Sequence, residues 1–251
     1  MNARRTLSAL TGLALAATIS SAAGLRQERA VTSEATRERV IGLLDIPDMV
    51  EGGCGPATPA TRDVFNEPTD PAPRGALAFI VHGRSNDGGT CDEGHLVLRS
   101  RHTPHESGVP TEESDYEVQA LVVYERAGEW FRVALPRGSG WVRGASQHFL
   151  PYPDLLVKRL AYIRKDWDGL LWSQPAGVAR KVPAKWRAHL RDDITADVLA
   201  VSQDGPDRWI QVRLLTESCG DTVPDVQPVT GWIRAYAPTG RPAAWFYSRG
   251  C

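Results

Sequence analysis

The most regular alternation of hydrophobic and polar positions in the chain surrounds a turn at Gly128. Apolar residues occupy alternating positions on the two sides of this turn, at Leu121, Val123, Phe131, Val133 and Leu135. A period of two is typical of antiparallel strands that bury one face. The stretch Tyr124–Gly144 therefore predicts a ribbon of short strands that ends in a Gly-Trp pair, Gly140-Trp141.

A second copy of this pattern lies further along the chain. Val201–Leu215 contains a turn, a Trp and an alternating strand, and Thr230–Arg234 supplies a second Gly-Trp pair. Two further segments occur at a similar spacing: Ile46-Pro-Asp is 19 residues before Phe65, and Tyr152-Pro-Asp is 20 residues before Trp172. The repetition predicts a duplicated β domain.

Other segments complete the expected secondary structure. Leu77–Val81 and Gly94–Leu98 predict buried strands, and Trp245–Tyr247 predicts an edge strand or a segment packed on the second domain. A short helix, capped by Thr32 or Ser33, is expected to run through Arg39, Val40, Leu43 and Leu44. The polar stretch His102–Asp115 predicts an exposed loop, and Leu155–Leu160 a brief helical turn.

Composition and length agree with a turn-rich β protein. The 251 residues include 23 Gly and 18 Pro, and they suffice for two small domains. The formal net charge is −1, with no block of Lys and Arg, so we expect no nucleic-acid partner. No phosphate-binding loop is recognisable, and no cofactor is expected.

The first 23 residues predict a cleaved signal peptide. Arg4 and Arg5 precede an apolar run from Leu7 to Ile19, and small residues follow near Ala23. The run is shorter than the roughly 20 residues that span a bilayer, so no transmembrane segment is expected in the mature chain. The sequence thus predicts a periplasmic or secreted protein, and leaves open a plain or a twin-arginine export route.

The four cysteines all follow the expected signal peptide. An even number of cysteines in an oxidising compartment favours disulfides, and three pairings are possible. Because the duplication places two in each half, we predict Cys54–Cys91 and Cys219–Cys251. A zinc site or a cysteine nucleophile is the alternative, but no C-x-x-C spacing supports it.

The repeated pattern resembles bacterial SH3-like domains. The residues that carry the resemblance are Gly128, Trp130, Val133, Gly140, Trp141 and Val142 in the first copy, and Gly205, Trp209, Val212, Gly231, Trp232 and Ile233 in the second. The resemblance implies a mainly β fold of two tandem, small, strongly bent barrels with loop insertions and short helical turns. The expected domains are 46–146 and 147–251, after a polar and helical segment at 24–45.

The resemblance also implies binding rather than catalysis, since such exported domains commonly bind peptidoglycan or peptides. Aromatic side chains beside the loops could stack on such a ligand. The ligand-binding candidates are Tyr124, Trp130, Trp209 and Tyr236, whereas the Gly-Trp residues Trp141 and Trp232 are expected to fill the barrel cores.

Metal binding and catalysis have weaker signals. His95, His102 and His105, with Asp92, Glu93 or Glu106 nearby, fit solvated loop residues better than a metal site, which needs three or four convergent ligands. No nucleophile elbow or flagged carboxylate pair is present. We therefore expect a non-enzymatic envelope binding module. The alternatives are an inhibitor or immunity protein that uses the insertions 82–116 and 216–229, and a hydrolase built on the histidine loop.

Overall fold

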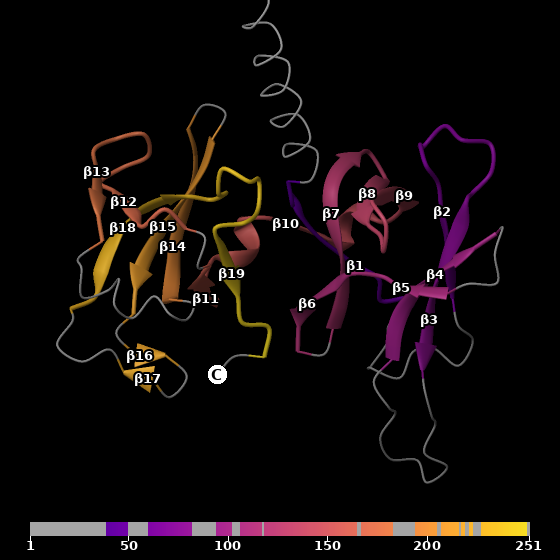
Figure 1. Cartoon of the computed structure of the whole chain (residues 1–251), viewed down its shortest axis with the longest axis horizontal. Coiled ribbons are helices and arrows are strands. Elements are labelled where there is room, and N and C mark those ends of the chain that lie inside the picture. Colours follow the sequence, from indigo (N-terminus) through magenta and orange to yellow (C-terminus); the bar gives the residue numbers. More distant parts are fainter. Residues whose placement is uncertain are drawn as a thin grey trace, which may run out of the picture. The chain divides into compact units, whose positions relative to one another are not determined.

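Antiparallel strands make up most of the regular structure in the computed structural model (Figure 1). The residues that the structure describes are 39–49, 60–81, 94–101, 106–116, 118–164, 167–182, 194–204, 207–215, 217–218, 221–222 and 227–249. They belong to one of the two units of the chain, Glu38–Cys251. Within these ranges the helices are single 3-10 turns, η1 (Ser146–His148) and η2 (Asp154–Leu156). The predicted mainly β class is confirmed.

The first large sheet is built around the Tyr124–Gly144 ribbon. Its strands lie in the order β10 (Phe149–Pro151), β1 (Gly42–Asp45), β7 (Val118–Ala127), β8 (Trp130–Ala134) and β9 (Ser139–Arg143). Strand β6 (Thr111–Asp115) also pairs with β7. A separate four-stranded sheet is inserted between β1 and β6 in the chain, and its strands are β2 (Thr61–Val64), β3 (Gly75–Val81), β4 (Gly94–Ser100) and β5 (Glu106–Gly108).

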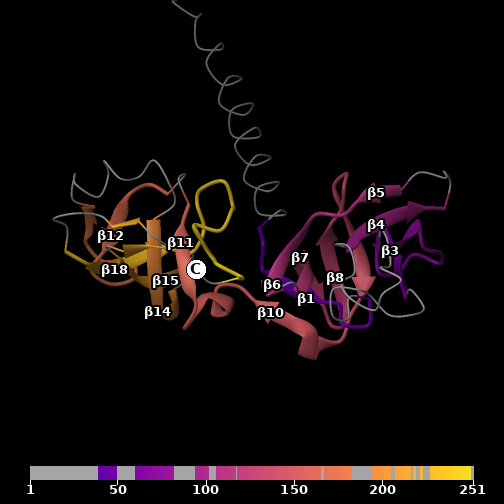
Figure 2. The same ribbon diagram turned by 90° about the horizontal axis from the view of Figure 1, so that it is seen from below.

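The second large sheet contains the second copy of the sequence pattern. Its order is β13 (Ala179–Lys181), β12 (Leu170–Trp172), β18 (Val229–Arg234), β15 (Asp207–Leu214), β14 (Ile194–Asp204), β11 (Leu160–Ile163) and β19 (Ala244–Phe246). Figure 2 shows β14, β15 and β18 side by side. A small hairpin, β16 (Glu217–Ser218) with β17 (Asp221–Thr222), lies between β15 and β18 in the chain.

The two copies of the sequence pattern form strand pairs with the same register. Trp130 pairs with Arg143 across β8 and β9, and Trp209 pairs with Arg234 across β15 and β18. Each Gly of the Gly-Trp pairs lies opposite a Val: Gly140 pairs with Val133, and Gly231 with Val212. The register of the two strand pairs, β8 with β9 and β15 with β18, is the same at each of these positions.

The repeat includes an irregularity in the preceding strand. The register shifts between Val123 and Glu125 in β7, and between Val198 and Ala200 in β14. Val123 pairs with Val133, and Val198 with Val212, so the shifts are equivalent. The residues at the shifts are Tyr124 and Leu199, which identifies Tyr124 as a bulge residue of the scaffold.

The predicted equivalence of Phe65 and Trp172 is correct, but that of Ile46 and Tyr152 is wrong. Phe65 forms a bridge with Trp141, and Trp172 forms the equivalent bridge with Trp232. Ile46, however, follows the strand β1 that pairs with β7, whereas Tyr152 precedes the equivalent strand β11. The two Pro-Asp dipeptides, Pro47-Asp48 and Pro153-Asp154, are therefore not at equivalent positions in the two halves.

The helix expected through Arg39–Leu44 is wrong where Gly42–Asp45 form β1, which lies between β10 and β7 in the first sheet. Adjacent apolar residues fit a helix face, but they also fit a strand that is buried on both sides. Leu44 packs in a core of first-half residues, and Leu43 packs in the core that holds the second-half strands. Tertiary contacts on both faces explain why the apolar spacing was misread.

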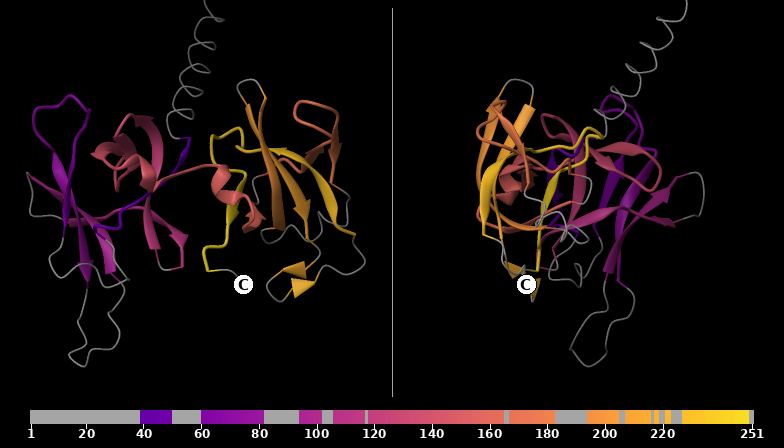
Figure 3. Two further views of the ribbon diagram at one scale, coloured as in Figure 1. Left: turned by 180° about the vertical axis from the view of Figure 1, so that it is seen from behind. Right: turned by 60° about the vertical axis from the view of Figure 1, so that its left-hand side comes forward.

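Two expectations at other edges had different outcomes. The exposed loop predicted at His102–Asp115 is wrong in its described part, because β5 and β6 lie there and pair with β4 and β7. The edge strand predicted at Trp245–Tyr247 is confirmed over Ala244–Phe246: β19 pairs with β11 at the end of the second sheet (Figure 3).

Candidate functional site

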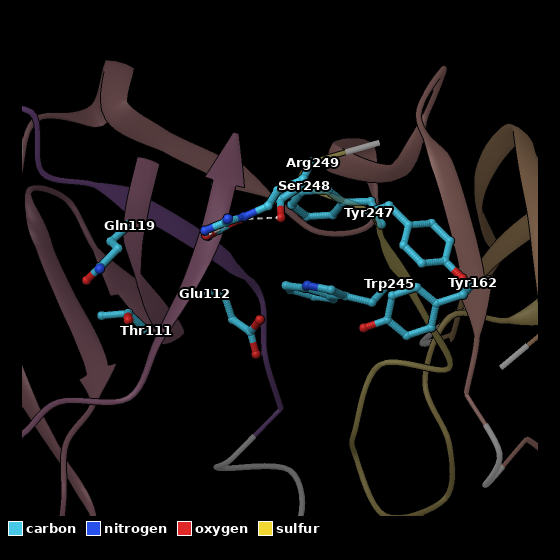
Figure 4. Close-up of a pocket in the computed structure, with 10 residues that line it drawn as sticks. Thr111, Glu112, Gln119, Tyr162, Trp245, Tyr247, Ser248 and Arg249 are labelled. Carbon is cyan, nitrogen blue, oxygen red and sulfur yellow. Dashed lines mark hydrogen bonds and ion pairs between the residues drawn. The ribbon is translucent and has the colours of Figure 1, made fainter. Parts of the chain in front are cut away.

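A cavity of about 670 Å³ lies among residues of β6, β7, β11 and the C-terminal segment that contains β19. Figure 4 shows that two chemically different groups of side chains line it. We call Thr111, Glu112 and Gln119 the polar wall, and Tyr162, Trp245 and Tyr247 the aromatic wall. The lining is completed by Glu113, Phe246, Ser248 and Arg249.

Strand pairing explains how the aromatic wall forms. Tyr162 lies directly opposite Trp245 in the β11–β19 pair, and side chains at opposite positions share a face of the sheet. Tyr247 is two residues after Trp245 and continues the same face. The rings of Tyr162 and Tyr247 have centroids 5.0 Å apart. Three aromatic side chains are thus held on one side of the cavity.

The aromatic wall rests on a rigid base at Tyr152. The ring of Tyr152 stacks on Trp245 with a centroid distance of 5.7 Å, and Tyr152 is fully buried. Its hydroxyl donates to the carbonyl oxygen of Ala235 at 2.7 Å, and the carbonyl oxygen of Ala244 lies 3.2 Å away as a second, longer acceptor. Burial raises the pKa of this hydroxyl, so it stays a neutral hydrogen-bond donor. Trp245 is held in place before any ligand arrives.

Glu113 ties the two sides of the cavity together. Its carboxylate accepts a hydrogen bond from the Ser248 hydroxyl at 2.7 Å and forms an ion pair with the Arg249 guanidinium. The Arg249 Nε atom lies 3.0 Å from Oε2 of Glu113. Hydrogen bonding from Arg249 is the main reason that the pKa of Glu113 lies below its ordinary value. The charge of Glu113 is therefore already compensated.

Glu112 is in a different situation. Within the described residues its carboxylate has no hydrogen-bond or ion-pair partner, and Figure 4 shows it extending from β6 toward Trp245. Glu112 is an exposed residue, and the cavity wall removes only part of the water around its carboxyl. This desolvation raises the pKa of Glu112, and the positive charge of Arg164 partly counteracts the effect.

The two candidates of the first half lie away from this cavity. Trp130 is half-buried and meets Phe65 edge-to-face at 5.2 Å, with the Arg143 guanidinium 4.9 Å from its ring centre. Tyr124 is half-buried at the bulge, and the Arg132 guanidinium lies 5.6 Å from its ring centre. Both rings retain partly open faces, but neither lines the cavity.

The two candidates of the second half are buried. Trp209 is 1% exposed and packs edge-to-face on Trp172 at 5.3 Å. Tyr236 is buried beneath the Arg39 guanidinium, and its hydroxyl donates to the Val40 carbonyl oxygen at 2.9 Å. Burial is the main cause of the raised pKa of Tyr236. Both residues hold the fold together, and we no longer propose them as ligand contacts.

The Gly-Trp residues were expected to be buried in the cores; Trp141 is buried as expected, whereas Trp232 is only half-buried. Trp141 pairs with Arg132, and Trp232 with Gln211, so each indole lies on the face opposite Phe131 or Ile210. Trp141 is 5% exposed and Trp232 is half-buried, but neither belongs to the core clusters of the described residues.

Several predicted features fall outside the described residues. These are the signal peptide at 1–23, the cysteines Cys54, Cys91, Cys219 and Cys251, and the histidines His102 and His105. His95 is described and lies exposed on β4. Among the residues that the structure describes, no group of three or more His, Cys, Asp or Glu side chains is placed to hold a metal ion.

Comparisons of the chain with protein-family models, with curated proteins and with solved structures found no match. In the described part of the chain, no helix has the length and apolar character that crossing a membrane requires.

Sequence reasoning noticed the aromatic run Trp245–Tyr247 but not its role. The polar wall was missed because Glu112 lies in a stretch that looked like a loop, and Gln119 carries no motif. Trp245 and Tyr247 lie more than a hundred positions after the polar wall, and contacts of β6 with Arg159, Ser248 and Arg249 join the two parts of the chain. The available signal was the excess of aromatic residues in a C-terminal segment.

Proposed function

We propose that this protein is an exported, non-catalytic binding module that takes a peptidoglycan, peptide or protein ligand in the bacterial envelope. The observation that carries the proposal is the cavity between the polar and aromatic walls. A concave site with several aromatic side chains and a few polar groups is the usual form of a binding pocket. Export itself is supported by the signal-peptide pattern at residues 1–23.

The strand order supports two SH3-like units as the scaffold. The first half has the order β10-β1-β7-β8-β9, and the second contains the equivalent run β19-β11-β14-β15-β18. In each run the last strand in the chain returns to pair with the first. The same order in both halves is what the resemblance to small, tandem barrels leads us to expect.

The charges around the cavity favour binding over acid-base catalysis. Ser248 and Arg249 both engage the Glu113 carboxylate, so this group is held in its ionised form. Glu112 is then the one carboxylate in the described lining without a hydrogen-bond or ion-pair partner. Because Ser248 and Arg249 already occupy the Glu113 carboxylate, it is not available as the second free carboxyl group that glycoside hydrolysis, for example, requires.

The test compares two half-buried tyrosines. Tyr247→Leu removes part of the aromatic wall, whereas Tyr124→Leu removes the sequence-predicted candidate at a bulge where the second half itself has Leu199. Purified protein is sedimented with isolated peptidoglycan and, separately, passed over immobilised envelope proteins. We expect Tyr247→Leu to weaken binding about tenfold, which corresponds to the loss of one good aromatic contact, and Tyr124→Leu to bind as the natural protein does.

Two results would overturn this proposal: no binding of the natural protein to either material, or equal binding by both variants. A circular-dichroism melt of each variant shows whether a loss of binding reflects a loss of folding.

An inhibitor or immunity protein remains the second candidate. The four-stranded sheet β2–β5 favours it, because this sheet is inserted into the first half and has no counterpart of equal size in the described second half. A rigid inserted sheet can present its loops to a protein partner. If this candidate is right, removal of the cavity's Tyr247 side chain leaves capture of the envelope protein unchanged.

A further inference from the structure

In the described cavity lining, one acidic side chain, Glu112, has no neighbouring cation bound to it. Arg249 is the only cation in the described lining, and Glu113 already neutralises it. Gln119 directs its amide nitrogen to the Gly94 carbonyl oxygen at 2.9 Å and is likewise engaged. What is left is the carboxylate of Glu112, which has no partner within the described residues. A carboxylate without a hydrogen-bonded or ion-paired partner is stabilised by a positively charged group placed beside it.

The opposite wall has the complementary property. Aromatic faces attract cations because the ring quadrupole is negative above and below the plane, and Trp is the strongest of them. Tyr162 and Tyr247, which are half-buried, supply two such rings on one face of the β11–β19 pair, and Trp245, which is 6% exposed, adds the part of its ring that lines the cavity. Figure 4 shows the Glu112 carboxylate reaching toward the Trp245 ring across the cavity.

We infer that the cavity recognises an ammonium group of its ligand, held between the Glu112 carboxylate and the aromatic wall of Tyr162, Trp245 and Tyr247. This inference rests on the proposed binding function and names the chemical feature that the site selects. The ammonium can belong to the side chain or terminus of a peptide, or to a quaternary ammonium headgroup. A neutral sugar would gain the stacking contacts but not the charge interaction.

Arg164 provides a test that acts in the opposite direction to Glu112. Its positive charge acts on the Glu112 carboxyl, although it forms no ion pair with Glu112 in the described structure and does not line the cavity. A bound cation is attracted by Glu112 and repelled by Arg164. Loss of the two charges should therefore change cation affinity in opposite directions, whereas general damage to the fold would weaken binding in both variants.

The experiment titrates the full-length protein with three probes and follows them by ligand-observed NMR. Nα-acetyl-lysine amide carries a primary ammonium, its Nε-acetylated derivative is the neutral control, and choline is the quaternary ammonium. The variants are Glu112→Gln and Arg164→Gln. Glu129→Gln is the matched control, since Glu129 is an exposed carboxylate at the β7–β8 turn, outside the cavity lining.

We expect both cationic probes to bind, and the neutral probe to bind at least about tenfold more weakly, as loss of a cation–aromatic and charge contact predicts. Glu112→Gln should weaken the cationic probes by a similar factor, Arg164→Gln should tighten them, and Glu129→Gln should leave them unchanged. The tighter of the two cations identifies the source of the ammonium in the natural ligand.

Three results would overturn the inference. The neutral probe could bind as tightly as the cations, neither cation could bind, or both charge variants could change the affinity in the same direction. Sedimentation with peptidoglycan tests the proposed function separately. If that binding persists and still depends on Tyr247 while the cationic probes fail, the binding function stands and its ligand is a neutral one.

Discussion

Trp130 and Trp209 lie at the same point of the same strand pair in the two halves, yet their surroundings differ. Each pairs with an arginine, Arg143 or Arg234, and each meets an aromatic ring edge-to-face. Trp130 is half-buried, whereas Trp209 is 1% exposed and its indole nitrogen has no hydrogen-bond partner in the described part of the chain. The Gly-Trp residues show the reverse order: Trp141 is the buried one.

Strand register and burial therefore have separate causes in this fold. The alternation of apolar residues and the paired glycines fix the register in both halves. Burial on the outer face depends instead on what the connecting segments place there. In the second half the partner of the Trp is the larger Trp172 instead of Phe65, and the Arg234 guanidinium lies 5.7 Å from the Trp209 ring centre and 5.8 Å from that of Trp172.

The largest expected effect comes from removing the two equivalent indoles. Trp209→Ala should lower the free energy of unfolding by about 3–5 kcal/mol, because it leaves a cavity beside Trp172. Trp130→Ala should lower it by only about 1–2 kcal/mol, since the ring is already partly in water. Chemical denaturation followed by circular dichroism measures both. Similar losses for the two variants would show that the halves bury these positions alike, which contradicts the structure.

A smaller effect is expected at the glycines that pair with valine. A β-carbon at Gly140 would lie 2.8 Å from Leu135 Cδ1 and 2.9 Å from Val64 Cγ1, and one at Gly231 would lie 3.0 Å from the β-carbon of Leu171. Gly140→Ala and Gly231→Ala should each cost about 1–3 kcal/mol of unfolding free energy, because the core must shift.

The same denaturation assay measures the two glycine variants. Gly128→Ala is a useful contrast, because that glycine has a φ of +63° with no atom near the added carbon, so any loss reflects backbone strain alone. If Gly140→Ala or Gly231→Ala is neutral, close packing is not the reason for the repeated Gly-Trp pair.

The smallest effect concerns the link between the halves at Glu113. Its pKa is below the ordinary value of 4.5, so its contribution to stability is present above that value and is lost as the pH falls through the lower, folded-state pKa. Glu113→Gln should lower stability at pH 7 by less than about 1 kcal/mol, since the ion pair is at the surface and partly exposed to solvent. It should also reduce the stability lost on acidification.

Thermal melts at pH 7 and pH 3 measure this prediction. Glu125→Gln is the control, because Glu125 pairs with Arg132 inside the first half at 3.0 Å. An unchanged pH dependence in Glu113→Gln would show that the Arg249 pair does not link the two sides in solution.

Much of the fold could be predicted from particular residues. Short apolar or aromatic runs between turn residues predict three of the strands: those at Leu77–Val81 and Gly94–Leu98, and the edge strand near Trp245. Strand β1 could not be predicted in this way, because Leu43 and Leu44 are adjacent apolar residues on opposite faces. Only the presence of a core on each side makes that arrangement favourable. Strand β6 was missed because its Glu-rich sequence has little strand propensity and is held by pairing with β7.

The sequence by itself determined the repeated ribbon, because side-chain alternation, a turn glycine and a Gly opposite Val are local requirements of a paired strand. The tertiary structure decided which aromatic residues are buried and where a ligand can enter. Tyr124 and Trp209 looked equivalent as candidates in the chain, but one is a bulge residue and the other lies beneath its neighbours. The cavity depends on Glu112 and Trp245 meeting across the packed halves, and contacts between residues so distant in sequence leave no local pattern to read.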